Sequence, residues 1–384
     1  MVYDLLIKGG SIVDPVAGTT TAGDIAVTGG RISAIAPSLA ENDANQIVDA
    51  RGLLVVPGLV DLHVHVWSGV AELAIDNDPN HLARGTTTVV DAGSSGSNTF
   101  RGFRRYVMDS SATRTLAFLH ISGMGQLDLE IGELEDIRWA RVDRAIQTAQ
   151  KHPDHIVGIK LRLSTVLVAS NARIAFDRAH EATQAIRKPL MLHIGGIVDG
   201  TFMLEDALAR LRPGDIVTHS FTGWPPGIVD NTGHVIDAAL DARRRGVIFD
   251  VGHGAGSFSF RVAEAALADG FAPNTISSDL HIGNINGPVY DLVTTLSKFL
   301  LLGLSVEEVI AMATHRPASA IGRRDLGTLK VGGIADISLL RLVDGQFTLK
   351  DSRGDTREAT RRLEPVATVR AGTLSTPSPW QGGT

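Results

Sequence analysis

The stretch Val56-Pro-Gly-Leu-Val-Asp-Leu-His-Val-His65 decides the fold. It is an apolar run of strand length in which one residue separates His63 from His65. Because successive side chains of a strand point to opposite faces, both imidazoles should lie on the same face, together with Asp61. Two adjacent imidazoles would supply half of the ligands of a metal site. A buried pair of structural histidines would show the same spacing, so the motif needs support from the rest of the chain.

Apolar runs of strand length recur along the chain after residue 59, and a polar, helix-prone segment follows each of them. The runs span residues 59–65, 86–91, 116–121, 156–162, 189–194, 215–219, 247–251 and 275–279. Eight units of a strand followed by a helix are what a parallel (β/α)8 barrel requires. The pattern therefore predicts a TIM barrel over residues 56–324. Ser305-Val-Glu-Glu308 is typical of a capped helix N-terminus near its end.

The two ends of the chain have a different pattern. Residues 1–55 hold short β-rich pieces separated by Gly-Gly and Asp-Pro turns, and residues 325–375 return to β-rich sequence. Since both segments flank the barrel in sequence, we expect them to pair into one small β-sandwich domain. The segment Ser122–Asp136 lengthens the third unit and is rich in acidic residues. It could be a lid over the catalytic face, but a solvated acidic loop is favoured.

Composition excludes several classes of function. The 384 residues carry 36 basic and 42 acidic side chains, a net charge of −6, and no basic run, which argues against a nucleic-acid partner. With no cysteine in the chain, any metal must be held by nitrogen and oxygen. We find no signal peptide and no apolar run long enough to span a bilayer. A cytoplasmic, homo-oligomeric protein with a small-molecule substrate and no membrane partner is expected.

Further polar residues close the predicted strands. His193, His219 and Asp279 end the fifth, sixth and eighth apolar runs. TIM barrels place their active sites at the carboxyl ends of their strands. Any one of these residues could be structural, but an unpaired buried cluster of them would be costly without a ligand. Their common position therefore favours a metal site that also includes His63 and His65.

Lys160 lies inside the fourth run, where a buried lysine is rare unless it is paired. Burial favours its neutral amine, which can react with CO2 to form a carbamate that bridges two cations. An internal salt bridge to Asp91 or Asp279 is the alternative. Arg162 shares the inward face and could hold a substrate carboxylate, although a structural ion pair is nearly as well supported.

Several other residues are candidates for binding substrate. His253 ends the seventh run in a glycine-rich loop, where it could bind substrate or stabilise the loop. His281 follows Asp279 by two residues and could orient it or contact substrate. The segment Gly93–Ser97 lacks the Lys-Ser/Thr of a P-loop, so a plain turn is favoured there over nucleotide binding. His120 ends the third run and could support a ligand.

The chain resembles the amidohydrolase superfamily, and three motifs carry the likeness: Val56–His65, Ala311–Ile321 and the returning Gly327-Thr-Leu-Lys-Val-Gly-Gly-Ile-Ala-Asp336. The resemblance implies an enzyme, a hydrolase that holds two divalent metal ions, with zinc expected and Mn, Fe or Co as alternatives. It assigns His63 and His65 to the more buried ion, His193 and His219 to the other, and carboxylated Lys160 to both. Asp279 would bind a metal and act as the catalytic base.

Within that superfamily the chain looks like a dihydroorotase-like group of metal-dependent deacetylases, on the segments Asp250–Phe258 and Asp279–His281. This likeness implies removal of an acetyl group from a small carboxylate-bearing substrate, such as an acetylated (R)-2-hydroxy acid or an N-acetyl amino acid. A cyclic amidase acting on dihydroorotate or a hydantoin is the alternative, although Val66 and Trp67 follow the histidine pair where dihydroorotases usually carry an arginine. A non-catalytic binding protein is a remote third possibility.

Overall fold

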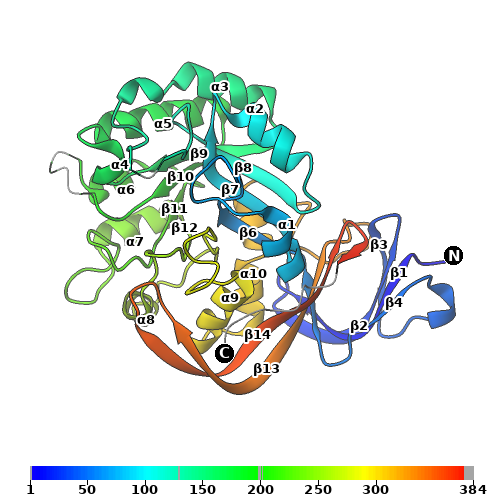
Figure 1. The fold of residues 1–384 in the computed structure, drawn as a ribbon. Helices are drawn as coiled ribbons and strands as arrows, with labels where there is room; N and C mark the ends of the chain where they lie inside the picture. The colour runs from blue at the N-terminus through cyan, green and yellow to red at the C-terminus, as the bar shows by residue number, and fades with distance from the viewer. Residues whose placement is uncertain (1, 129, 198–199, 201, 376–384) are drawn as a thin grey trace.

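The computed structural model describes residues 2–128, 130–197, 200 and 202–375. It contains a curved parallel sheet surrounded by helices and a mixed sheet at one side, from which a long hairpin extends along the barrel (Figure 1). Within the described residues, no helix has the length and apolar character needed to cross a membrane.

The parallel sheet follows chain order. Its strands are β6 (Leu59–Val64), β7 (Thr86–Gly96), β8 (Arg114–His120), β9 (Ile156–Arg162), β10 (Leu190–His193), β11 (Ile216–Thr218) and β12 (Ile248–Phe249). The eighth predicted run closes the ring through isolated parallel bridges, Asp250 to Thr275 on one side and Val64 to Leu280 on the other. The predicted TIM-barrel-like fold is confirmed. Among the residues described, the eighth segment forms no regular strand, but its backbone accepts hydrogen bonds from the loop after β12 at Thr275, Ser277 and Ser278.

Helices cover the outside of the barrel (Figure 1). They are α1 (Asn77–Asn80), α2 (Phe100–Phe103), α3 (Val142–Lys151), α4 (Thr165–Val168), α5 (Ala172–Ile186), α6 (Leu204–Arg210), α7 (Asp237–Arg244), α8 (Phe260–Ala268), α9 (Leu292–Leu301), α10 (Val306–Met312) and α11 (His315–Ala320). The capping box predicted at the start of α10 is present, because Ser305 Oγ accepts a hydrogen bond from the Glu308 backbone N–H at 3.2 Å.

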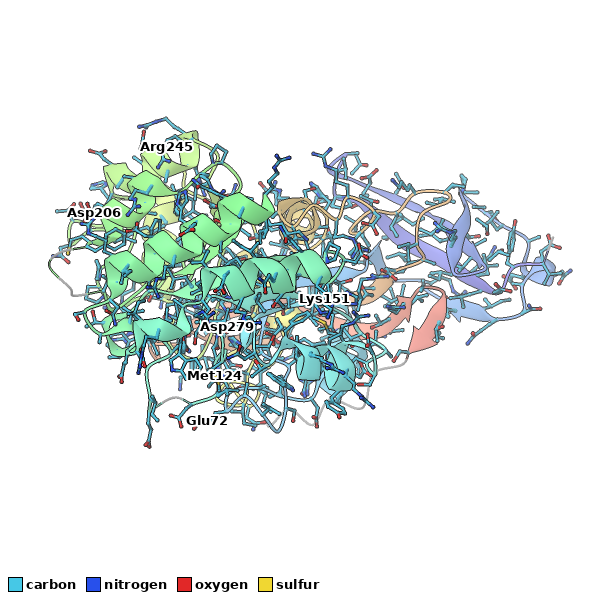
Figure 2. The ribbon with its side chains drawn as sticks, turned by 90° about the horizontal axis from the view of Figure 1, so that it is seen from above. Glu72, Met124, Lys151, Asp206, Arg245 and Asp279 are labelled. Atoms are coloured by element: carbon cyan, nitrogen blue, oxygen red, sulfur yellow. The ribbon has the colours of Figure 1, made fainter. Side chains whose placement is uncertain are left out.

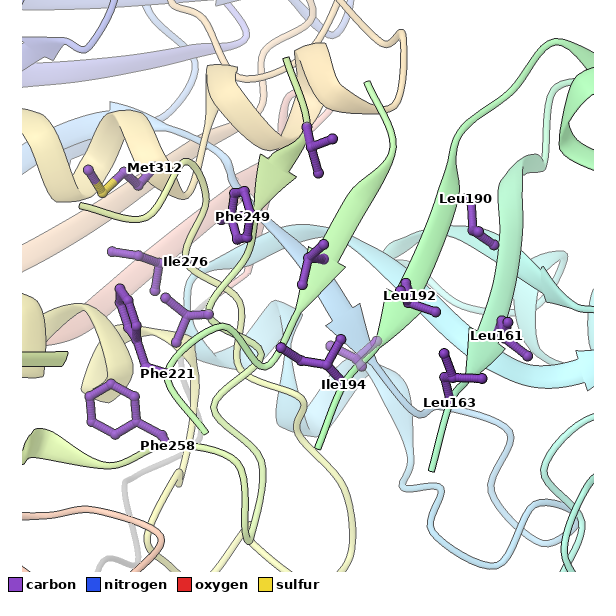
Figure 3. Close-up of a cluster of buried hydrophobic side chains, with 14 of the residues drawn as sticks. Leu161, Leu163, Leu190, Leu192, Ile194, Phe221, Phe249, Phe258, Ile276 and Met312 are labelled. Carbon is purple, nitrogen blue, oxygen red and sulfur yellow. The ribbon is translucent and has the colours of Figure 1, made fainter. Parts of the chain in front are cut away.

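Alternation along the strands separates the core from the site. The leucines of β9, of the residue after it and of β10 point outward into one buried cluster with side chains from later segments of the barrel (Figure 3); they are Leu161, Leu163, Leu190 and Leu192. Burying each such side chain contributes about 1.5–3 kcal/mol to folding. The residues that alternate with these leucines, Lys160 and Arg162 on β9 and His193 on β10, therefore face the barrel interior.

The two β-rich ends of the chain join in one mixed sheet, as predicted. Its order is β15 (Thr373–Ser375), β14 (Thr356–Arg370), β13 (Ile337–Lys350), β5 (Leu54–Pro57), β1 (Leu5–Asp14), β2 (Thr19–Thr28) and β3 (Arg31–Ala36), with β4 (Ile47–Asp49) paired to β1. Side chains of its strands form an apolar cluster separate from that of the barrel. Its arrangement as a two-sheet sandwich, and the boundaries at residues 55/56 and 324/325, stay predictions.

The hairpin of β13 and β14, with its turn at residues 351–355, leaves the mixed sheet and runs along the barrel to α8 (Figure 1). We call it the β-arm. The Leu363 backbone N–H donates to Ser297 Oγ of α9 at 2.9 Å, and Arg357 forms an ion pair with Glu264 of α8 at 2.7 Å. The β-arm thereby brings a C-terminal segment to the loops that follow the last barrel strands.

A buried ion pair ties the barrel to the mixed sheet. The guanidinium of Arg114, the first residue of β8, contacts the carboxylate of Asp336, which immediately precedes β13. The same carboxylate accepts a hydrogen bond from the Ala371 backbone N–H at 2.8 Å. Both ionised side chains are almost fully shielded from water, so neither can lose its partner without a large desolvation penalty.

Replacing Asp336 with alanine should lower the free energy of unfolding by about 3 kcal/mol, because it leaves the buried Arg114 charge without its anionic partner. Urea denaturation followed by circular dichroism measures the change. The matched control is Asp143→Ala, which removes an exposed pair with Arg141 and should leave the urea midpoint unchanged. Equal midpoints for the two variants would contradict the structural role of the Asp336 pair.

Candidate active site

A cavity of about 140 Å³ opens at the carboxyl ends of the barrel strands. Figure 2 labels Asp279, one of its lining residues, within the barrel. The residues that line the cavity are His63, His65, Leu73, Lys160, Arg162, His193, His219, Ala255, Gly256, Ser257, Asp279 and His281. All six predicted metal ligands are therefore brought together, along with two of the three predicted substrate-binding residues.

Asp279 forms a tight group with His63 and His65. The Nε2 atoms of the two histidines lie 3.3 Å and 3.2 Å from the same carboxylate oxygen, Asp279 Oδ1. That oxygen is buried and accepts no hydrogen bond from any described residue. Two imidazole nitrogens and a carboxylate oxygen that converge in this way suit a divalent cation, which would satisfy all three atoms at once.

The opposite ring nitrogens identify which tautomer each histidine adopts. Thr218 Oγ1 donates its proton to Asp250 Oδ2 at 2.8 Å, so it must accept from His63 Nδ1 at 2.9 Å. His219 Nδ1 lies 2.7 Å from the Gly252 carbonyl oxygen, which can only accept. In both rings the proton is on Nδ1, and the Nε2 lone pair is left for a metal.

Burial disfavours the charged form of these imidazoles. It is the main cause that lowers the pKa of His63 well below its ordinary value, with the Lys160 charge adding to it. Burial likewise lowers the pKa of His219 to about 4. Burial by itself would raise the pKa of Asp279, but the neighbouring imidazoles, His63 first, hold it well below its usual range. Neutral imidazoles and an ionised carboxylate are the forms that bind metals.

Lys160 is fully buried at the centre of the site. Its Nζ lies 3.2 Å from His63 Nε2, and burial lowers its pKa to about 7. Gly93 makes room for it, since an added Cβ at that position would lie 2.9 Å from Lys160 Cγ. The salt bridge considered as an alternative is not formed: among the described carboxylates, neither Asp91 nor Asp279 pairs with the amine, and Asp91 accepts backbone hydrogen bonds instead.

His193 and His219 form the second half of the site. Their rings are 4.3 Å apart and nearly perpendicular, and the ring of His219 is 5.0 Å from that of His63. His219 follows the last residue of β11 with φ of 67°, and Asp279 has φ of 48°. Left-handed backbone costs a non-glycine residue about 1–3 kcal/mol and is concentrated at functional sites. Strand alternation alone would not turn both side chains into the cavity.

Arg162 lines the cavity and also forms a buried ion pair. Its Nη1 lies 2.6 Å from Glu133 Oε1, and the other oxygen of Glu133 lies 3.0 Å from His120 Nε2. Burial would raise the pKa of Glu133, but Arg162 and His120 outweigh it and lower the pKa to about 2. The expectation of a solvated acidic loop is therefore wrong for Glu133, which sequence analysis missed as a partner of the site.

The two remaining candidates have different surroundings. His281 lines the cavity, and its Nδ1 accepts a hydrogen bond from the Gly283 backbone N–H at 3.1 Å. His253 is not brought into the cavity: its ring is buried behind the loop that follows β12 and contacts Lys298. Residues 93–96 of the predicted turn instead form the end of β7, where Ser94 Oγ lies 3.1 Å from His65 Nδ1, and a turn begins at Ser97.

Comparison with known proteins agrees with this geometry. A protein named deacetylase from Agrobacterium fabrum is 37% identical over 344 residues, which cover 89% of this chain and 84% of the relative. Another deacetylase, from Enterococcus faecalis, is 35% identical over 97% of this chain and 99% of its own length. A model of the amidohydrolase family matches residues 257–374. The chain belongs to the amidohydrolase superfamily.

Solved structures extend the similarity to the whole fold of this amidohydrolase. An adenine deaminase matches with a TM-score of 0.91 and 33% identity, covering 97% of this chain and 100% of the other. A dihydroorotase matches with a TM-score of 0.87 and 34% identity, covering 97% and 98% of the two chains. The chain is therefore a metal-dependent hydrolase, and the donor set at the barrel mouth fits that class.

Thr218→Val should weaken metal binding about 10–100-fold, because the His63 ring loses the acceptor that fixes its tautomer and orientation. Competition with a zinc-binding dye measures the affinity. Thr222→Val is the matched control, since Thr222 is also buried after β11 but its hydroxyl accepts from Trp224 and does not contact a histidine. An affinity of Thr218→Val equal to that of the control would show that the hydroxyl does not orient a ligand.

Proposed function

We propose that this amidohydrolase removes an acetyl group from a small carboxylate-bearing molecule, either an acetylated (R)-2-hydroxy acid or an N-acetyl amino acid. The observation that carries the proposal is the convergence of six metal-donor side chains and Arg162 on one cavity of about 140 Å³. Relatives named deacetylase, 35–38% identical over most of the chain, support the choice of an acetyl group.

The donor set fits two divalent cations, with zinc as the expected metal. His63, His65 and Asp279 would hold one, His193 and His219 the other, and Lys160 would reach both after carboxylation. In that step the neutral amine attacks CO2, forms a carbamate N–C bond and releases a proton; the lowered pKa of Lys160 supports it. When bound, such a pair of cations supplies hydroxide at neutral pH and polarises the acyl carbonyl.

Asp279 is the proposed catalytic base. Its carboxylate faces the cavity, where it can take a proton from the attacking water and return it to the leaving oxygen or nitrogen. Asn284 Nδ2 donates to the Asp279 backbone carbonyl at 2.8 Å and so fixes the residue. Arg162 would bind the substrate carboxylate, while Glu133 takes Nη1 and holds the guanidinium at the cavity wall. His281 would contact the substrate from the opposite loop, and a substrate role for His253 remains a prediction.

Hydrolysis of a cyclic amide is the second candidate, favoured by the structural similarity to dihydroorotase. Such a substrate would use the same donors but needs no pocket for acetyl. A non-catalytic binding protein is disfavoured, because all six donor positions are filled. A cytoplasmic location and a homo-oligomeric assembly remain predictions.

Protein loaded with zinc and bicarbonate should release acetate from one enantiomer of acetylated 2-hydroxy acids or amino acids in preference to the other. Asp279→Asn should lower kcat about 10²–10⁴-fold while circular dichroism remains unchanged, because the proton acceptor is lost. Dihydroorotate and hydantoins are assayed alongside. Ring opening without acetate release would replace the deacetylase proposal by the cyclic amidase, and full activity of Asp279→Asn would rule out the assignment of the base.

Arg162→Lys should raise KM for a carboxylate-bearing substrate about 10–100-fold, because lysine cannot offer a two-pronged donor to the carboxylate. An acetyl ester without a carboxylate should be hydrolysed at an unchanged kcat/KM. Arg212→Lys is the control, since Arg212 pairs with buried Asp215 ahead of β11 and lies outside the cavity. Equal losses for charged and uncharged substrates would mean that Arg162 acts on the fold of the site.

A further inference from the structure

A second buried lysine lies beside the proposed active site. Lys298 on α9 has no exposed surface, and it is absent from the residues that line the cavity. Its Nζ lies 2.6 Å from His253 Nε2 and donates to the Pro288 carbonyl at 2.8 Å. Burying an amine costs free energy unless its hydrogen bonds are satisfied. The groups that satisfy them, His253 and the Pro288 carbonyl, are therefore the groups that Lys298 can hold in place.

The tautomer of His253 follows from the hydrogen bond of its second ring nitrogen, Nδ1. Its Nδ1 lies 3.0 Å from the Gly254 carbonyl oxygen, which can only accept, so the ring proton is on Nδ1. Nε2 is therefore the atom that accepts from Lys298. Burial lowers the pKa of His253 well below its ordinary value, consistent with a neutral ring, and the ring stacks on Phe258 at 4.6 Å. Lys298 thus acts on Gly254 through a ring with one fixed orientation.

Gly254 is held from two further directions. Ser352 Oγ, in the turn of the β-arm, donates to the same Gly254 carbonyl at 2.8 Å. The Gly254 backbone N–H donates to the Ser278 carbonyl at 3.0 Å, in the segment that closes the barrel. Contacts from α9 (through His253), the β-arm and the closing segment therefore meet at this one residue, on the two peptide groups that flank its Cα.

The Cα of Gly254 lies directly against Asp279. Gly254 has φ of 59°, and an added Cβ would lie 2.5 Å from Asp279 Oδ2. The three residues after it, 255–257, line the cavity. A displacement of Gly254 would therefore move the wall that packs against the carboxylate and alter the loop above it.

We propose that Lys298 is a positioning residue, which through His253 fixes Gly254 against the carboxylate of Asp279 and so supports turnover more than substrate binding. The inference rests on the proposed function of Asp279. Under this proposal His253 links Lys298 to Gly254 and does not contact the substrate. The role agrees with the position of its ring, which is not among the residues that line the cavity.

Lys298→Met keeps the length of the side chain and removes its donor. We expect kcat to fall at least about tenfold with KM within about twofold of wild type, since small misplacements of a reacting group are costly. Metal content should be unchanged, and amide hydrogen exchange in peptides covering residues 252–257 should become faster. Lys188→Met is the matched control, because Lys188 donates to backbone carbonyls, Pro153 among them, outside the cavity. Its kcat and its exchange at residues 252–257 should equal those of wild type.

Ser352→Ala provides a milder variant that removes the second donor to Gly254, and it decides the question should Lys298→Met fail to fold. We expect its kcat to fall about threefold, a smaller loss than in Lys298→Met, and its KM to stay close to that of wild type. Wild-type kcat and wild-type exchange at residues 252–257 in these variants would overturn the proposal. If wild type releases no acetate from any substrate, the proposed function fails; faster exchange in Lys298→Met would then still support the positioning role, and unchanged exchange would overturn it.

Discussion

The structure depends on the cost of keeping a carboxylate and several imidazoles out of water. Asp279 Oδ1 is buried with no hydrogen-bond donor among the described residues, while the Nε2 atoms of His63 and His65 point at it. For His63 this arrangement is unfavourable by itself, because its Nε2 lone pair faces the lone pairs of the carboxylate oxygen in a region with little solvent. A cation reverses the sign of each of these interactions. The donor set therefore makes sense as a metal site, in agreement with the superfamily.

The surrounding polar residues make that arrangement possible. Thr218 and the Gly252 carbonyl take the Nδ1 protons, so the barrel itself selects the metal-binding tautomers. Asp250 in turn accepts hydrogen bonds from Thr218, Thr275 and Ser277, which lie on neighbouring segments of the barrel wall. The network spans the seam where the eighth segment replaces a regular strand. The same hydrogen bonds thus close the barrel and orient the ligands.

Sequence patterns predicted the barrel and the residues whose direction follows from alternation, such as His63 and His65. The left-handed backbone at His219 and Asp279 could not be read from a period of two, and their place in the cavity was expected only from their position at strand ends. Glu133 was missed because its partners come from two other strands, and a charge-rich segment normally faces solvent. The β-rich sequence at both ends of the chain predicted that the two ends pair. The path of the β-arm could not be predicted in the same way, because it depends on contacts between residues far apart in sequence.

These long-range contacts also bear on what distinguishes members of the superfamily. The adenine deaminase and the dihydroorotase have closely similar folds, so the barrel alone does not select a reaction. Selection must come from the walls of the cavity, which here are built by loops held in place from outside the barrel. Glu133 fixes Arg162 on one side, and Ser352 of the β-arm holds Gly254 on the other. A change in either support could alter the substrate while every proposed metal ligand stayed the same.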